Sequence, residues 1–206
     1  MKTKAQLVQY ASRSLVAALT VIAFIGCRSA KEEPRSSMPA PAAASTAPVG
    51  PAKAAPGVIR IRAGDTAPFT DSKGNVWLAD QGFADGETTP RAGDLKIENT
   101  EDPGLYRAER YSMTAFSYPL SNGKYTVKLH FAETFEGITG PGQRVFSFKV
   151  QDREFKDFDI WVKAGGARRA YVETVPVEIT NGKLSITFTP GIENPETNGI
   201  EIIPGA

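Results

Sequence analysis

The sequence predicts an all-β fold for residues 58–206, with two sheets packed as a β-sandwich or jelly roll. Two observations indicate this fold. Short runs of residues alternate between apolar and polar, as strands with one buried face do, and turn-forming residues separate the runs. No window of a dozen residues shows the apolar spacing of a helix. Turn-punctuated strands over about 150 residues are typical of such sandwiches.

Five runs carry the strand pattern most clearly. They cover residues 58–62, 124–131, 144–150, 183–189 and 200–203. Alternation predicts which apolar side chains of the three central runs face the core: Tyr125, Val127, Leu129, Phe131, Phe146, Phe148, Val150, Leu184, Ile186 and Phe188. The polar face of the second run contains His130, the single histidine, to which we assign no functional role.

Local signals predict how these strands connect. Asn122-Gly123 and Asn181-Gly182 each precede a strand, and Asn-Gly favours the tight turns that join hairpins. Asn198-Gly199 precedes the last run in the same way. Residues 157–160 (Asp-Phe-Asp-Ile) predict an edge strand whose two acids are solvated or pair with arginine. Arg110 is interpreted as one partner of a structural ion pair.

The first 57 residues differ in composition from the rest. Basic residues precede an apolar run of twelve, residues 15–26, which is the length of a signal-peptide core and too short to span a bilayer. The run ends at Cys27, the single cysteine, and resembles the bacterial lipoprotein cleavage box. That resemblance implies a signal peptide over 1–26, cleavage after Gly26 and lipidation of Cys27, which gives an anchor in the membrane. Arg28 favours the outer membrane of the bacterial cell envelope.

A spacer follows the cysteine. Residues 34–56 contain six prolines and eight alanines without hydrophobic periodicity. Such a segment buries too little apolar area to fold, so residues 27–57 are expected to be an extended linker.

Composition excludes several classes of protein. One cysteine and one histidine leave no disulfide framework and no Cys-rich or His-pair metal site, and we expect no cofactor. Residues 58–206 carry 17 basic and 21 acidic side chains without a basic stripe, which argues against nucleic-acid binding. No hydrolase, phosphate-loop or dinucleotide motif is present. Carboxylates such as Glu133 and Glu193 leave a glycosidase as a minor alternative.

Three aromatic residues fall outside the alternating pattern. Trp77 follows a run of turn formers, Phe135 lies beyond the end of its strand, and Tyr111 closes the segment Glu109-Arg110-Tyr111. An aromatic ring beside acids and amides suits a sugar, because the ring covers the apolar face of the pyranose while polar groups bond its hydroxyls.

Residues 58–205 resemble the malectin domain, a carbohydrate-binding sandwich of the galactose-binding-like kind. The resemblance rests mainly on the segments Leu105–Tyr111 (LYRAERY) and Gly123–Glu133 (GKYTVKLHFAE). It is supported by the segments at residues 61–64, 71–80, 142–146, 157–160 and 198–202.

The resemblance implies a sugar site at one end of the sandwich. Its positions fall at Trp77, Tyr111, Phe135, Glu136 and Glu193, and Asn194 beside Glu193 is added to them. The rings at 77, 111 and 135 are expected to stack on the sugar, and the other three side chains to bond its hydroxyls. Glu136 replaces an apolar ring by a charge and Phe135 lacks a hydroxyl, so a preference for glucose disaccharides is not carried over.

The sequence therefore predicts a membrane-tethered lipoprotein that binds an oligosaccharide or polysaccharide without catalysis. A different class, an envelope interaction or scaffold module with a protein partner, is the alternative. A glycoside hydrolase is the third.

Overall fold

The computed structural model describes residues 57–205. The expected signal peptide, the lipidated Cys27 and the linker lie outside these residues. Within the described part, no helix has the length and apolar character needed to cross a membrane. No group of three or more histidine, cysteine or acidic side chains is placed there to hold a metal ion.

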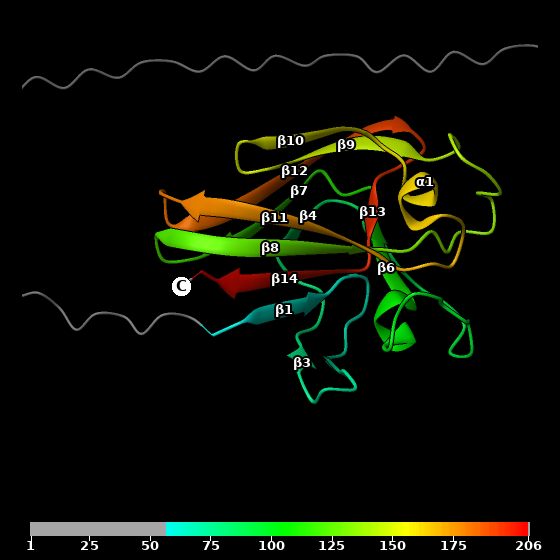
Figure 1. The fold of residues 1–206 in the computed structure, drawn as a ribbon, viewed down its shortest axis with the longest axis horizontal. Helices are drawn as coiled ribbons and strands as arrows, with labels where there is room; N and C mark the ends of the chain where they lie inside the picture. Colours follow the sequence, from blue (N-terminus) through cyan, green and yellow to red (C-terminus); the bar gives the residue numbers. More distant parts are fainter. Residues whose placement is uncertain (1–56, 206) are drawn as a thin grey trace, which may run out of the picture. The chain divides into compact units, whose positions relative to one another are not determined.

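Two antiparallel sheets form the sandwich that the alternation predicted (Figure 1). The four-stranded sheet has the order β1 (Ile59–Arg62), β14 (Gly199–Pro204), β8 (Gly123–Phe131) and β11 (Tyr171–Ile179). The five-stranded sheet has the order β10 (Arg153–Phe158), β9 (Val145–Val150), β12 (Lys183–Ile192), β7 (Ala115–Pro119) and β4 (Phe83–Ala84). All-β architecture is therefore confirmed.

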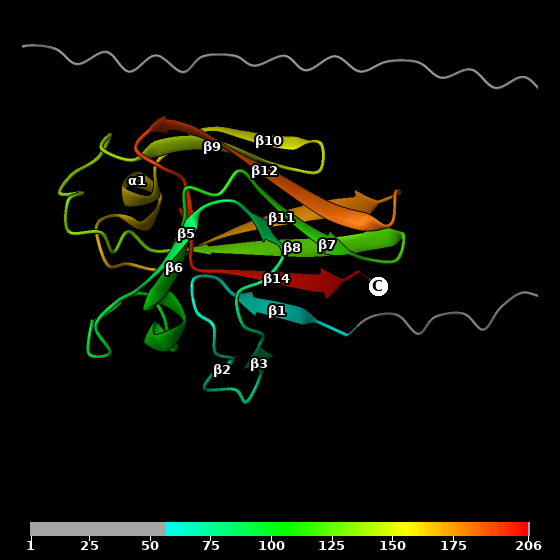
Figure 2. The same ribbon diagram turned by 180° about the vertical axis from the view of Figure 1, so that it is seen from behind.

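Smaller elements complete the molecule. A three-stranded sheet has the order β13 (Glu196–Thr197), β6 (Ala108–Tyr111) and β5 (Glu87–Pro90), and β2 (Phe69–Thr70) pairs with β3 (Val76–Trp77). Among residues 57–205, the helical segments are the 3-10 turn η1 (Pro103–Tyr106) and α1 (Ile160–Ala164). Figures 1 and 2 show β5, β6, β13, η1 and α1 gathered at one end of the sandwich, away from the C-terminal end of β14.

The core lies between the two large sheets and has the predicted composition. All ten side chains assigned to it by alternation are buried. Phe131, Phe146, Phe148 and Phe158 pack as an aromatic cluster with ring centroids 4.9–6.3 Å apart. Such contacts add about 0.5–1.5 kcal/mol per pair to the free energy of burial.

The predicted hairpins at the Asn-Gly pairs are wrong. Strands β7 and β8 flank Asn122-Gly123 but belong to different sheets, and so do β11 and β12 around Asn181-Gly182. Each turn therefore carries the chain from one sheet to the other. The two turns bond to each other, because the Asn122 amide donates to Thr180 O (3.0 Å) and accepts from Gly182 N (2.9 Å).

The segment at residues 157–160 is only partly an edge strand. Strand β10 does lie at the edge of its sheet, but it ends at Phe158. Asp159 is buried instead of solvated, and its carboxylate caps α1 by accepting from Val162 N at 3.2 Å. A side-chain acceptor at this position satisfies an amide that the first helical turn leaves free.

Gly64 allows β1 and β6 to approach closely. It has a φ of +86°, and a Cβ atom there would lie 2.3 Å from the Glu109 backbone. Its N–H donates to Asp80 Oδ2 (2.8 Å), and Asp80 also pairs with Arg110. Arg110 therefore does form a structural ion pair, as the sequence indicated.

We predict that Asn122→Ala lowers the free energy of unfolding by about 1–2 kcal/mol, because two hydrogen bonds that join the inter-sheet turns are lost. Urea unfolding followed by circular dichroism measures the change. Asn181→Ala is the matched control, since the described structure shows no side-chain hydrogen bond from Asn181. Equal effects of the two variants would contradict this account of the turns.

Candidate functional site

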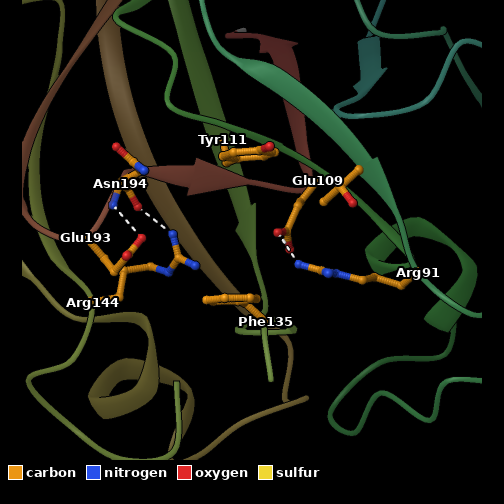
Figure 3. A pocket seen from close by; sticks show the side chains of 8 residues that line it. Arg91, Glu109, Tyr111, Phe135, Arg144, Glu193 and Asn194 are labelled. Atoms are coloured by element: carbon orange, nitrogen blue, oxygen red, sulfur yellow. Dashed lines mark hydrogen bonds and ion pairs between the residues drawn. The ribbon is translucent and has the colours of Figure 1, made fainter. Parts of the chain in front are cut away.

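A pocket of about 270 Å³ lies at the end of the sandwich where the three-stranded sheet meets two loops. Its wall residues are Thr89, Arg91, Glu109, Tyr111, Phe135, Arg144, Glu193 and Asn194. In Figure 3, Tyr111 and Phe135 lie on opposite sides of the space. Glu193, Asn194 and Arg144 form one flank, and Glu109 and Arg91 form the other.

Strand pairing explains how β5 and β6 contribute their side chains. Thr89 lies opposite Glu109 and Glu87 lies opposite Tyr111 in the register of the two strands. The period of two then presents all four side chains on one face of this small sheet. The Tyr111 hydroxyl donates to Glu87 Oε2 at 2.7 Å, and this hydrogen bond raises the pKa of Tyr111.

One buried ion pair supports one flank of the pocket. Arg91 bonds Glu109 through its terminal nitrogen, and its Nε donates to Thr134 Oγ1 at 3.0 Å. Thr134 in turn donates to Glu109 Oε2 at 2.6 Å, so the three side chains close a ring of hydrogen bonds. Both Glu109 oxygens therefore already have partners.

A second buried ion pair supports the opposite flank. Arg144 Nε donates to Glu133 Oε2 at 2.7 Å, and both side chains are at most 4% exposed. The other Glu133 oxygen accepts from Phe135 N (2.9 Å), and the Arg144 Nη1 donates to Asn194 O (2.5 Å). This pair therefore fixes the backbone on both sides of the pocket, at Phe135 and at Asn194.

Glu196 is the third buried carboxyl at this end of the sandwich. It is fully buried on β13 opposite Tyr111, and neither of its oxygens has a hydrogen-bond partner. Burial raises the pKa of Glu196 well above its ordinary value of 4.5, and Glu109 and Glu133 raise it further against the opposing effect of Arg144 and Arg91. Burial lowers the pKa of Arg144, but Glu196 and Glu133 raise it by more.

The structure brings together four of the six predicted sugar-site residues. Tyr111, Phe135, Glu193 and Asn194 line the pocket. Glu136 does not line this pocket; it lines a neighbouring hollow next to Phe135.

Trp77, expected to stack on the sugar, lies elsewhere and does not line the pocket. The side chain is 3% exposed and packs in a second core cluster with Leu105 and Tyr106. Its indole N–H donates to Asp71 Oδ2 at 3.1 Å, and its ring meets His130 edge-on with centroids 5.1 Å apart. The two-residue strand β3 offered no alternation from which its inward orientation could be inferred.

His130 is likewise buried, although the strand pattern placed it on the polar face. Its Nδ1 hydrogen-bonds the Tyr106 hydroxyl (2.9 Å) and its Nε2 hydrogen-bonds Glu201 Oε1 (3.1 Å). Burial raises the pKa of Tyr106 far above its ordinary value. This network is satisfied by its own members and lies outside the pocket.

Sequence reasoning missed Thr89, Arg91 and Arg144 as pocket residues. It named Glu133 only as a carboxylate of the glycosidase alternative, and Glu109 only as part of the segment that Tyr111 closes. Arg144 did fall at the start of a predicted strand that follows a Gly-Pro-Gly turn. The pairings Arg91–Glu109 and Arg144–Glu133 join residues 18 and 11 positions apart, so no periodic pattern signals them.

The fold and the site define a class: a β-sandwich binding module with an aromatic and charged pocket at one end. Residues 57–203 match the malectin domain, so the chain belongs to the malectin domain family.

Curated relatives extend the comparison. The chain is 38% identical over 140 residues to a probable leucine-rich repeat receptor-like serine/threonine-protein kinase of Arabidopsis thaliana, covering 59% of this chain and 14% of that protein. It is 36% identical over 100 residues to Malectin-B of Xenopus laevis, covering 44% and 35%. The chain therefore spans well under two thirds of the length of either relative.

Solved structures share the fold at low identity. A β-glucuronidase of Bacteroides uniformis superposes with a TM-score of 0.65 at 19% identity, over 72% of this chain and 18% of that one. The extracellular domain of ANXUR1 from Arabidopsis thaliana gives 0.62 at 19% identity, over 70% and 47%. These similarities support the β-sandwich architecture alone.

We predict that Glu196→Gln changes how stability depends on pH. The folded protein holds the Glu196 proton to a higher pH than the unfolded chain does, so the free energy of unfolding falls as pH rises from about 4.5 through the raised pKa. Glutamine stays neutral and lacks this loss. The variant should therefore gain stability over the wild type with pH, by up to about 1.4 kcal/mol per unit.

Urea unfolding between about pH 5 and about pH 8 measures the effect. Glu178→Gln, at an exposed position on β11, is the control and should run parallel to the wild type. Parallel curves for Glu196→Gln would show that Glu196 is ionised in the folded state.

Proposed function

We propose that the pocket between Tyr111 and Phe135 binds a carbohydrate without acting on it. The observation that carries the proposal is the pair of aromatic side chains on opposite sides of a small pocket whose flanks are polar (Figure 3). Rings cover the apolar C–H faces of a pyranose, and amide and carboxylate groups bond its hydroxyls. Membership of the malectin domain family supports the same function.

The ion pairs in the pocket favour an uncharged sugar. Two arginines in a pocket would suit an anionic ligand, but Arg91 is committed to Glu109 and Arg144 to Glu133. Glu193 and Glu87, both exposed, add negative charge beside them. A uronic acid would therefore meet carboxylates without a free cation, whereas neutral hydroxyls meet both donors and acceptors.

The hydrogen bonds that Glu109 and Glu133 already accept also favour binding over hydrolysis. A glycosidase uses a pair of carboxyl groups that are free to exchange protons or attack the sugar, about 5–10 Å apart. Both oxygens of Glu109 and of Glu133 accept hydrogen bonds from the protein. These two side chains therefore serve to build the pocket.

The size of the pocket suggests weak binding. Small-molecule sites usually measure about 300–1,000 Å³, so a pocket near 270 Å³ holds one or two sugar rings. With two rings as the main apolar contacts, we expect dissociation constants of roughly micromolar to millimolar.

We further propose that this domain is held at the bacterial envelope by lipidated Cys27. The apolar run at 15–26, the cysteine that ends it and the Pro/Ala-rich segment after it support this context.

A protein partner is the second candidate for the binding function. One structural neighbour is described as a complex of the plant peptide RALF23 with FER and LLG2. Capture of an envelope protein that survives excess free sugar would favour that candidate.

We predict that Phe135→Ala weakens glycan binding at least about tenfold, because it removes one of the two rings while the rest of the pocket stays in place. The Phe135 side chain is 43% exposed, so its loss should change the melting temperature little. A glycan array followed by titration calorimetry measures the affinity.

Val76→Ala is the matched control, because Val76 is 57% exposed on β3 and lies outside the pocket lining. It should leave binding unchanged. Undiminished binding by a folded Phe135→Ala protein would reject the proposed site, and a blank array with folded wild type would favour the protein-binding alternative.

A further inference from the structure

A second hollow shares Phe135 with the pocket. It measures about 380 Å³, and we call it the outer groove. Its lining includes Phe135, Glu136, Ile138, Trp161 and Arg168. The pocket and the outer groove therefore meet at Phe135, whose side chain is 43% exposed.

The position of Trp161 follows from how α1 is anchored. Ile160 is fully buried in the core, and Val162 is 61% exposed. Trp161, between them, is half-buried and lines the outer groove. Asp159 caps the helix and also accepts from Gly142 N at 2.6 Å, which ties α1 to the loop beyond Phe135. A large aromatic ring is thus presented to the groove by an anchored backbone.

The polar side of the outer groove is an exposed ion pair. Arg168 Nη2 lies 3.3 Å from Glu136 Oε1, and both side chains are about half or more exposed. Exposed pairs of this kind contribute little to stability, so their donors and acceptors are available to a ligand. The backbone N–H of Arg168 donates to Glu133 O (2.8 Å), which links the groove to the ion pair beneath the pocket.

We propose that the outer groove is a second sugar subsite, in which Trp161 stacks on a further residue of the glycan whose end occupies the pocket. This inference rests on the proposed carbohydrate function and extends it to a glycan longer than the one or two rings that the pocket holds. A glycan is the expected occupant because the groove adjoins the pocket at Phe135. A sugar chain that leaves the pocket past this ring enters a space that again combines an aromatic ring with planar charged groups. Glu136, which does not reach the pocket, acquires its ligand role here.

The test is a length series on wild-type protein. Maltose to maltohexaose, cellobiose to cellohexaose, and chitobiose to chitohexaose serve as probes in titration calorimetry. For the series that binds, we expect affinity to rise about three- to tenfold between the disaccharide and the tetrasaccharide, the contribution typical of one aromatic contact. Trp161→Ala should remove this gain and leave the disaccharide affinity unchanged.

Two controls separate stacking from a structural role of Trp161. Val162→Ala truncates the neighbouring exposed side chain of the same helix and should keep the full gain. Trp161→Phe retains a smaller ring and should keep part of it. Fluorescence gives an independent readout in the wild type, since the other tryptophan, Trp77, is buried. The tetrasaccharide should protect Trp161 from iodide quenching, and the disaccharide should not.

Two results would overturn the subsite. One is an affinity independent of chain length; if Phe135→Ala still abolishes disaccharide binding, this result keeps the proposed function and rejects the outer groove alone. The other is a Trp161→Ala variant that loses disaccharide and tetrasaccharide binding equally. Absence of binding across all three series, with the protein folded, would reject both.

Discussion

The geometry of the pocket depends on the buried ion pair between Glu133 and Arg144. Each partner also holds a backbone group: Glu133 accepts from Phe135 N, and Arg144 donates to Asn194 O. One interaction therefore positions a ring on one side of the pocket and an amide on another. Removing one partner of a buried pair typically costs about 3–5 kcal/mol, because the remaining charge is left without compensation.

The sandwich supplies the platform on which this pair is built. Glu133 follows β8 and Arg144 precedes β9, so the pair joins the ends of two inner strands, one from each large sheet. The three-stranded sheet closes the same end and brings Glu109, Tyr111 and Glu196 beneath and beside the pocket. The cluster holds three carboxyls and two guanidinium groups, so one carboxyl has no matching cation. Burial raises the pKa of that carboxyl, Glu196.

Period-two alternation was sufficient to predict the long strands and their inward side chains, because burying one face of a strand imposes that pattern. Alternation was insufficient where contacts distant in sequence determine the strand connections and the burial of a side chain. The Asn-Gly turns cross between sheets because the next strand belongs to the other layer, which no local residue specifies. Trp77 is buried in a strand of two residues, too short to alternate. Tyr111 and Phe135 were found as aromatics without a core assignment, whereas Arg144 and Arg91 act through partners that only the fold reveals.

The most direct test of the central claim is to map the sugar on the protein. Backbone amide spectra recorded by NMR during titration with an array-positive disaccharide locate the contact residue by residue. The account predicts that the largest shifts fall at Tyr111, Phe135 and Asn194, which surround the pocket. Shifts centred on Trp77 and His130, with the pocket amides unchanged, would contradict it.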